Sequence, residues 1–356
     1  MQAECAYRRA QDAFSKRCIT ECLQLLHRAE RAGYPPDECA AYRWQCWMLL
    51  GRFEDAWRES DAIVGRGQPD PNRLWDGRPF RGKRVIIRCL HGFGDALQFL
   101  RYGALLRREA ASVLVQTHPQ LVSLLRGASF VDDVTTWTDG PGFCPDDWDQ
   151  QIEVMELTRA FRTTVDCIPA DVPYLSVPPV FQRESCDRLG PKSCPRIGLL
   201  WAGGGWDDSR NVPLSELLPA LDVRGLDLIS FQRGTSRAEL ARLDPHGTVR
   251  DLSGDSPDVT HFAADLMHID LLITVDTMAA HLAGALARPV WMLLPYQADW
   301  RWMLDRDDTP WYPTMRLFRQ LTPGDWRGPV RKIAAALEEL LKAKHLHEPL
   351  NFVNIR

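Results

Sequence analysis

No apolar run in the sequence approaches the roughly 20 residues that a membrane-spanning helix needs. The first residues also lack the apolar segment of a signal peptide, so we expect a cytoplasmic protein without a membrane span. Without a secretion signal, the 10 cysteines are expected to stay reduced. Cys18 and Cys22 have the spacing of two ligands on one helix face, but no nearby His or Cys pair completes a metal site.

Neither acidic nor basic residues are in large excess, with 47 Asp and Glu against 43 Lys and Arg. The formal net charge is -4, so electrostatics favour neither nucleic acid nor an anionic membrane as a partner. Hydrophobic residues make up 45% and charged residues 25%, which is the balance of a soluble globular protein. At 356 residues, the chain is long enough for two or three domains.

Residues 1–68 are expected to form a helical domain. Apolar residues follow helical spacing in four segments, 3–14, 19–32, 38–50 and 53–64. Residues 47–56 resemble a tetratricopeptide repeat, with an aromatic residue, a Leu-Gly turn and a second aromatic residue; an irregular helical cap is the alternative. About two repeats are fewer than independent stability requires, so this block is expected to pack against the following domain.

Strand and helix patterns alternate in two series beyond residue 72. The first series has strand patterns at 84–90, 112–116, 131–137 and 151–156, with helical patterns at 96–109 and 120–126. The second has strand patterns at 196–201, 227–231, 249–252, 271–275 and 289–294, with helical patterns between them. Such alternation is typical of a parallel sheet with crossover helices.

A proline-rich segment, residues 172–179, separates the two series. We therefore predict an α/β protein with two Rossmann-like domains, 73–180 and 195–325, facing a cleft, and a C-terminal helix and tail over 326–356. Ligands in such sheets bind beyond the carboxyl ends of the strands. The residues that directly follow predicted strands are therefore the candidates for a site.

The first candidate site is the segment Gly92-Phe93-Gly94-Asp95. Glycines after a strand let the backbone turn tightly and approach a ligand. The third glycine of a dinucleotide-binding turn is absent, and so is the Gly-Lys-Ser/Thr of a phosphate-binding loop. What remains is the carboxylate of Asp95 at the start of a helix, where it either caps that helix or acts in catalysis.

The second candidate site is the strand-to-helix turn at residues 275–281. The free N–H groups and the dipole of a helix N-terminus suit a diphosphate, and Thr277 can add a hydroxyl donor. Asp276 can accept hydrogen bonds from sugar or ribose hydroxyls, and His281 lies on the same helix face as Thr277. The alternative is a capped helix packed by alanines, with His281 as a satisfied polar residue.

The third candidate site is the glycine-rich loop at residues 202–210. Arg210 in this loop is a candidate clamp for a phosphate, because its planar fork bonds oxyanions in pairs. Asp207 and Asp208 form an acidic pair, but no further acidic ligands accompany them, so we expect no metal site. An aromatic cluster follows later in the chain and suits either sugar stacking or core packing: Trp300, Trp302, Trp311 and Tyr312.

Six segments follow one another along the chain: 75–77, 92–102, 197–203, 230–232, 275–286 and 299–302. In this order they resemble bacterial tetratricopeptide-linked glycosyltransferases. That family is similar to lipopolysaccharide heptosyltransferases and, more distantly, to protein O-linked N-acetylglucosamine transferases. The resemblance implies the two-Rossmann (GT-B) fold and metal-independent transfer with inversion at the anomeric carbon. It also implies a nucleotide-diphosphate sugar as co-substrate, no cofactor, and a hydroxyl of a protein or glycan as acceptor.

By position, the resemblance makes Asp95 the general base. It assigns the donor diphosphate site to Arg210, Gln232, Asp276, Thr277, Met278, Ala279 and His281. It assigns the acceptor side of the cleft to His91, Gly92, Gly94, Gln98 and Trp300. The sequence departs from the family where Leu90-His91 replaces Glu-Gln and where Asn211 replaces the serine after Arg210.

We therefore predict an inverting glycosyltransferase that binds no metal, with the helical domain as a candidate guide for the acceptor. A relative that binds a nucleotide or a partner without turnover is the first alternative, because Glu-Gln is missing before Gly92. An NAD-type oxidoreductase is the second, disfavoured because neither domain has a Gly-x-Gly-x-x-Gly turn. Nucleic acid is not an expected partner.

Overall fold

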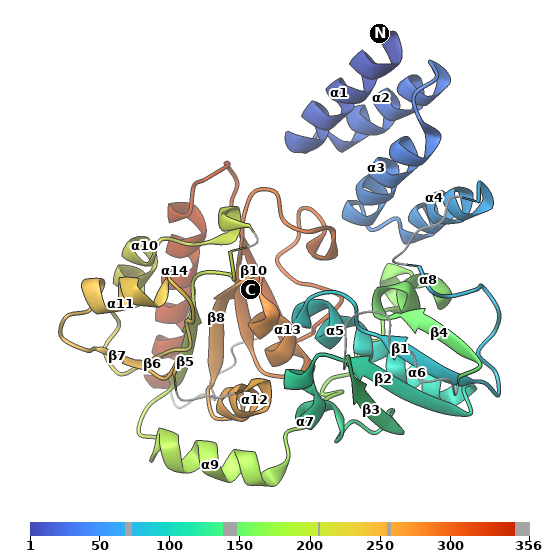
Figure 1. Ribbon diagram of the computed structural model, residues 1–356. Helices are drawn as coiled ribbons and strands as arrows, with labels where there is room; N and C mark the ends of the chain where they lie inside the picture. Colours follow the sequence, from blue (N-terminus) through green and yellow to red (C-terminus); the bar gives the residue numbers. More distant parts are fainter. Residues whose placement is uncertain (68–72, 138–147, 206, 255–257, 346–356) are drawn as a thin grey trace. The chain divides into compact units, whose positions relative to one another are not determined.

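The computed structural model describes residues 1–67, 73–137, 148–205, 207–254 and 258–345. Cys144, Trp206 and the tail beyond residue 345, which the sequence analysis included, lie outside the described residues. The chain divides into two compact units, which are described separately here (Figure 1). Unit 1 comprises Met1–Leu74, Glu156–Ile168 and Gln297–Arg306, and unit 2 comprises Trp75–Met155, Pro169–Tyr296 and Asp307–Arg356.

Four helices form the first part of unit 1, in the four segments where helical spacing predicts them: α1 (Gln2–Ser15), α2 (Ile19–Arg31), α3 (Pro36–Leu49) and α4 (Phe53–Gly65). Gly33 and Gly51 stand at the turns after α2 and α3 with φ of 92° and 71°, a conformation that glycine adopts without strain. The core between α1, α2 and α3 contains fully buried small and branched residues, among them Ala10, Leu26 and Cys46. The tetratricopeptide likeness of residues 47–56 stays a prediction.

Two segments from far along the chain complete unit 1, carrying α8 (Leu157–Ala160), η4 (Val165–Cys167) and η6 (Trp300–Trp302). The indole Nε1 of Trp57 donates to the carbonyl of Thr163 at 2.7 Å. The Trp300 ring lies 5.3 Å from the ring of Trp44, in an edge-on arrangement. The helical residues therefore share their core with chain from well beyond residue 68.

A four-stranded sheet forms the first part of unit 2, in the order β3-β2-β1-β4 with every pair parallel. Its strands are β1 (Arg84–Arg88), β2 (Ser112–Thr117), β3 (Asp133–Thr136) and β4 (Gln150–Glu153). Val85, Ile86 and Ile87 of the central strand β1 are completely buried, as expected of a strand covered on both faces.

The helical pattern at 96–109 is not one helix in the structure. It is divided into α5 (Phe93–Phe99), η1 (Leu100–Tyr102) and α6 (Gly103–Glu109), and η2 (Pro119–Leu121) and α7 (Val122–Leu125) follow β2. Gly103 opens α6 where the ring of Phe130 lies against the backbone, so close that an added Cβ would be 2.2 Å from the ring. This close approach requires glycine at the start of α6.

A six-stranded sheet forms the second part of unit 2, in the order β10-β9-β8-β5-β6-β7, again with every pair parallel. Its strands are β5 (Arg196–Leu200), β6 (Asp227–Ser230), β7 (Val249–Asp251), β8 (Leu271–Val275), β9 (Val290–Leu294) and β10 (Met315–Arg319). The predicted class, α/β with parallel sheets, is therefore confirmed, although the strand pattern of β10 was not recognised in the sequence.

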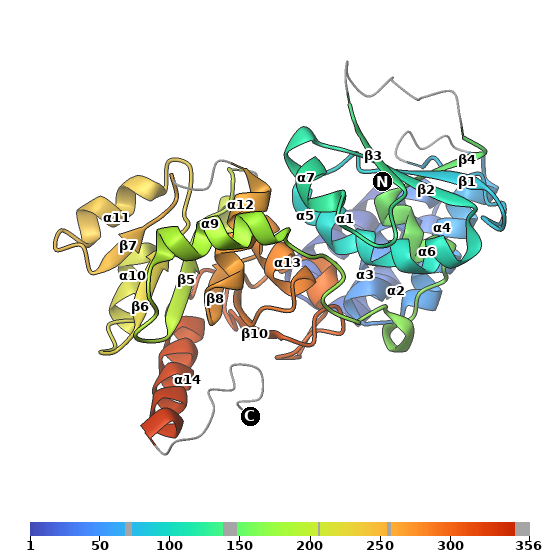
Figure 2. The same ribbon diagram turned by 90° about the horizontal axis from the view of Figure 1, so that it is seen from below.

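The following helices connect strands of this sheet: η5 (Asp208–Arg210), α10 (Leu214–Ala220), α11 (Arg237–Leu243), α12 (Val259–Met267) and α13 (Met278–Ala285). Helix α9 (Pro179–Leu189) precedes β5, and α14 (Arg327–His345) follows β10. Helix α9 was not predicted, because it begins within the proline-rich segment. It lies beside α12 (Figure 2), and the Ser185 hydroxyl donates to the buried carboxylate of Asp265 at 2.6 Å. Within the described residues, no helix has both the length and the apolar character to span a bilayer.

Candidate functional site

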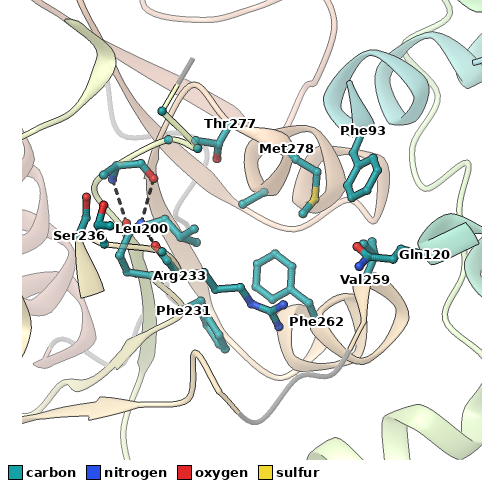
Figure 3. A pocket seen from close by; sticks show the side chains of 18 of the residues that line it. Phe93, Gln120, Leu200, Phe231, Arg233, Ser236, Val259, Phe262, Thr277 and Met278 are labelled. Atoms are coloured by element: carbon teal, nitrogen blue, oxygen red, sulfur yellow. Dashed lines mark hydrogen bonds between the residues drawn. The ribbon is translucent and has the colours of Figure 1, made fainter. Parts of the chain in front are cut away.

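A pocket of about 560 Å³ opens in unit 2 at the carboxyl edge of the six-stranded sheet (Figure 3). The loops that follow β5, β6 and β8 form most of its wall, because the carboxyl ends of parallel strands meet at one edge. The start of α12 and two residues from the first part of unit 2, Phe93 and Gln120, complete it. The lining residues include Gly203, Gly204, Gly205, Phe231, Gln232, Arg233, Thr235, Ser236, Asp258, Val259, Phe262, Thr277, Met278 and Ala279.

The N-terminus of α13 forms one side of this pocket. Thr277 is the residue before the helix, with an extended backbone (φ -142°, ψ 172°), and its side chain does not cap the helix. The first N–H groups of a helix have no partner within it, and the helix dipole makes this end positive. Thr277, Met278 and Ala279, three residues predicted for the donor site, therefore line a pocket wall that suits an anion.

Gln232 joins the loops after β5 and β6. Its Oε1 accepts from the backbone N–H groups of Trp201 and Ala202, each at 2.9 Å. Its Nε2 donates to the carbonyls of Ala202 at 3.1 Å and Arg233 at 2.9 Å. Backbone carbonyls accept both N–H donors of this amide, so Gln232 holds the two loops in place. Gln232 also lines the pocket, and its role in donor binding stays a prediction.

Arg210 lies close to the β8–α13 turn without lining the pocket. Its Nη1 donates to the carbonyl of Asp276 at 3.1 Å, and its Nε is 3.7 Å from a carboxylate oxygen of Asp207. The guanidinium is therefore directed at the turn, where the backbone occupies one of its donors. That Arg210 binds the donor diphosphate stays a prediction.

Asp276 and His281 are buried beside the pocket and do not line it. His281 Nε2 lies 3.7 Å from Asp276 Oδ1, and His281 Nδ1 is 3.1 Å from the hydroxyl of Tyr312. Burial raises the pKa of the Tyr312 hydroxyl well above its usual value, so this hydroxyl stays protonated at neutral pH. These contacts fit the alternative of a satisfied polar His281 that packs behind the turn.

A buried arginine continues this polar cluster into the first part of unit 2. The guanidinium of Arg101 donates to the carbonyls of Gln98 at 2.9 Å, Pro169 at 3.1 Å, and Trp311. It also lies 4.4 Å from the centre of the Tyr312 ring, within the range of a cation–π contact. Arg101 is 2% exposed, so these contacts replace all of its water.

The glycines of α5 and α13 allow this packing. A Cβ on Gly94 would lie 3.0 Å from Cδ2 of His281, and a Cβ on Gly284 would lie 2.4 Å from the ring of Tyr312. Gly94 therefore allows α5 to pack closely against α13. The space at Gly92 is larger, because a Cβ added there would lie 3.5 Å from its nearest neighbour, Oδ2 of Asp95.

We expect Gly284→Ala to lower the free energy of unfolding by about 1–3 kcal/mol, the usual cost of an overpacked core. The Tyr312 ring cannot move easily, since it is completely buried. Gly94→Ala should cost less, because the added methyl group needs a smaller displacement. Urea unfolding of both variants checks this order, and a Gly284→Ala protein as stable as the wild type would contradict the packing described here.

Asp95 is the third residue of α5. Its Oδ2 accepts the backbone N–H of Gly92 at 3.2 Å, so Asp95 caps the start of the helix. A helix cap was one of the two roles that the sequence left open for this residue. The side chain is half-buried, and Phe93 in the same turn lines the pocket. The helical cap and a catalytic role are compatible, because a carboxylate oxygen has more than one acceptor site.

His91, Gln98 and Trp300 were also assigned to the acceptor side, and the structure places them in three different environments. His91 is exposed, with Nε2 4.0 Å from Oε1 of the buried Glu153. Gln98 is completely buried, and in the described part of the chain its side-chain amide has no hydrogen-bond partner. Trp300 belongs to unit 1, where it packs against Trp44.

The structure also places residues in the pocket that the sequence analysis did not single out. Phe231 and Phe262 lie with ring centres 5.3 Å apart, and Arg233 and Asp258 supply its charged side chains. Arg233 lies three residues after the end of β6, so its position close to the end of a predicted strand was a usable signal. Among the described residues, no three or more His, Cys, Asp or Glu side chains are grouped as metal ligands, and this includes Asp207 and Asp208.

No protein-family model matches the sequence. Protein FlbA from Caulobacter vibrioides (strain ATCC 19089 / CIP 103742 / CB 15) is 24% identical over 370 residues, a match that covers 90% of this chain. The chain spans 59% of the length of that curated relative.

Two solved structures resemble this chain in fold. The glycosyl transferase family 9 protein from Veillonella parvula DSM 2008 has a TM-score of 0.56 at 10% identity, covering 76% of this chain and 99% of that one. The E. coli ADP-heptose lps heptosyltransferase II has a TM-score of 0.56 at 16% identity, covering 74% of this chain and 99% of that one. The resemblance to heptosyltransferases that the sequence predicted is therefore confirmed at the level of the fold.

Proposed function

We propose that this chain is an inverting glycosyltransferase that moves a sugar from a nucleotide-diphosphate sugar to a hydroxyl of a protein or glycan. The observation that carries the proposal is the pocket at the carboxyl edge of the six-stranded sheet, where the N-terminus of α13 meets the loops after β5 and β6. Its volume of about 560 Å³ is in the range of small-molecule sites. The fold shared with two glycosyltransferase structures supports the same assignment.

In this proposal Asp95 removes the proton of the acceptor hydroxyl while the hydroxyl oxygen bonds to the anomeric carbon of the sugar. The bond between that carbon and the diphosphate oxygen breaks, and negative charge develops on the leaving diphosphate. The amides at the start of α13 and an arginine stabilise that charge. The six-stranded part of unit 2 is thus the donor-binding part, the four-stranded part carries the base, and the helical unit is a candidate guide for the acceptor.

A nucleoside diphosphate that fits the pocket should raise the melting temperature, because a ligand specific for the native state stabilises it. At 100 times its dissociation constant the ligand contributes about 2.7 kcal/mol. Screening ADP, UDP, GDP and CDP by thermal unfolding identifies the base. A protein whose melting temperature none of them changes would not have the proposed donor site.

We expect transfer to continue in excess chelator. A helix N-terminus and an arginine at the diphosphate supply the positive charge that a metal ion supplies in other transferases. The measurement is the rate of nucleoside diphosphate release with and without EDTA. Loss of activity that manganese or magnesium restores would contradict this prediction and bring Asp207 and Asp208 back as ligand candidates.

The alternative is a protein with this fold that binds a nucleotide or a partner without turnover. Two observations favour it: Asp95 is engaged as a helix cap, and His91 replaces the glutamine of the family before Gly92. Stabilisation by a nucleoside diphosphate without release of that diphosphate from any nucleotide sugar would support this alternative.

A further inference from the structure

Among the described residues that line the pocket, Arg233 is the only cation and Asp258 the only acid. Arg233 directly follows Gln232 on the loop after β6, and the Gln232 amide donates to the Arg233 carbonyl at 2.9 Å. This hydrogen bond therefore holds the backbone of Arg233 in place. Figure 3 shows its side chain extending from this loop into the pocket, toward Phe262.

The acid of the pocket is already engaged. Oδ1 of Asp258 accepts from the backbone N–H of His261 at 2.9 Å and lies 2.9 Å from ring Nδ1 of the same residue. Burial acts to raise the pKa of this carboxyl, but the hydrogen bonds from His261 outweigh it and the pKa is lowered. Asp258 thus remains ionised as the cap of α12, where the N–H groups of the helix stabilise it.

Arg210 was predicted from the sequence to bind the diphosphate. In the structure its guanidinium bonds to backbone outside the pocket lining. It donates one N–H to the carbonyl of Asp276, a residue of the β8–α13 turn, lies near Asp207, and does not line the pocket. An arginine fork placed inside a pocket can bond two oxygens of one anion, whereas an N–H bonded to a carbonyl of the turn holds the turn itself.

We propose that Arg233 is the arginine that binds the diphosphate of the donor, and that Arg210 positions the turn at Thr277. This inference rests on the proposed function, since it names the residue that recognises the diphosphate of the same pocket. The Arg233 guanidinium and the amides at the start of α13 contact the diphosphate from different walls of the pocket.

Isothermal titration calorimetry with ADP, UDP and inorganic pyrophosphate tests the inference on the full chain. Arg233→Gln should weaken binding of each ligand that the wild type binds by roughly 10- to 150-fold, the value of charged hydrogen bonds. Affinity for the corresponding nucleoside, which has no phosphate, should not change. Arg237→Gln is the matched control, because Arg237 is exposed on the nearby helix α11 and pairs with Asp251 at 2.8 Å.

Thermal unfolding of both variants verifies that each remains folded. Unchanged diphosphate affinity in Arg233→Gln would overturn this inference and leave the proposed function standing, with Arg210→Gln then expected to lose affinity. A wild-type protein that binds neither nucleoside diphosphates nor pyrophosphate would overturn the proposed function and this inference together. An equal loss in Arg233→Gln and Arg237→Gln would indicate a general effect of charge and would also overturn the inference.

Discussion

An Asp95→Asn variant is expected to lose sugar transfer by about 10²–10⁴-fold, the usual contribution of a general base, while it keeps its fold and its affinity for nucleoside diphosphates. Asparagine has the same shape as aspartate, but its amide does not accept the proton of an attacking hydroxyl. Its carbonyl oxygen can still accept the Gly92 N–H that Asp95 now accepts at 3.2 Å, so the start of α5 should stay capped.

Initial rates of nucleoside diphosphate release, together with the melting temperature, measure this effect. His91→Gln is measured beside it, because His91 is the other candidate base at this sheet edge and is exposed. It should retain most of the activity. Turnover by Asp95→Asn at the wild-type rate would show that another group is the base, and loss of activity in His91→Gln would make His91 that group.

An Arg101→Ala variant is expected to lose about 3 kcal/mol or more of its free energy of unfolding, since each buried acceptor left without a donor costs about 1–3 kcal/mol. Three carbonyls lose a donor when the guanidinium is removed, namely those of Gln98, Pro169 and Trp311. The contact with the Tyr312 ring is lost as well.

Urea unfolding measures the effect of Arg101→Ala. The control is Arg107→Ala, because Arg107 is half-exposed in the following helix α6 and pairs with Asp132 at 3.3 Å on the surface. Its cost should stay within about 0.5 kcal/mol, as for most surface positions. Equal stability of the two variants would mean that the buried arginine does not stabilise unit 2.

The regular elements of this fold are predictable from local patterns of residues. The run Leu271–Val275 is completely buried in β8, and the small residues after Thr277 form α13 as expected. Strand β10 was not predicted, because Arg316 and Arg319 interrupt the apolar residues over Met315–Arg319 without the regular alternation that indicates a half-buried strand. The need for glycine at Gly103, where α6 begins, comes from the Phe130 ring, which lies outside the segment.

The site is less predictable than the fold, because a side chain's direction depends on residues distant in sequence. A strand-to-loop position identifies Thr277 and Gln232 as residues of this sheet edge. Only the structure shows that Gln232 bonds to backbone on both loops and that Arg233, its neighbour, lines the pocket. The packing of Trp300 was unpredictable for the same reason, since its aromatic partner Trp44 is far away in the sequence.

The most direct test of the central claim is incubation of the purified full chain with a panel of ADP-, UDP-, GDP- and CDP-sugars, followed by measurement of free nucleoside diphosphate. We expect release from the one nucleotide class that also raises the melting temperature, and much slower release by Asp95→Asn. Absence of release from every sugar in the panel, together with no thermal stabilisation by any nucleoside diphosphate, would contradict the central claim.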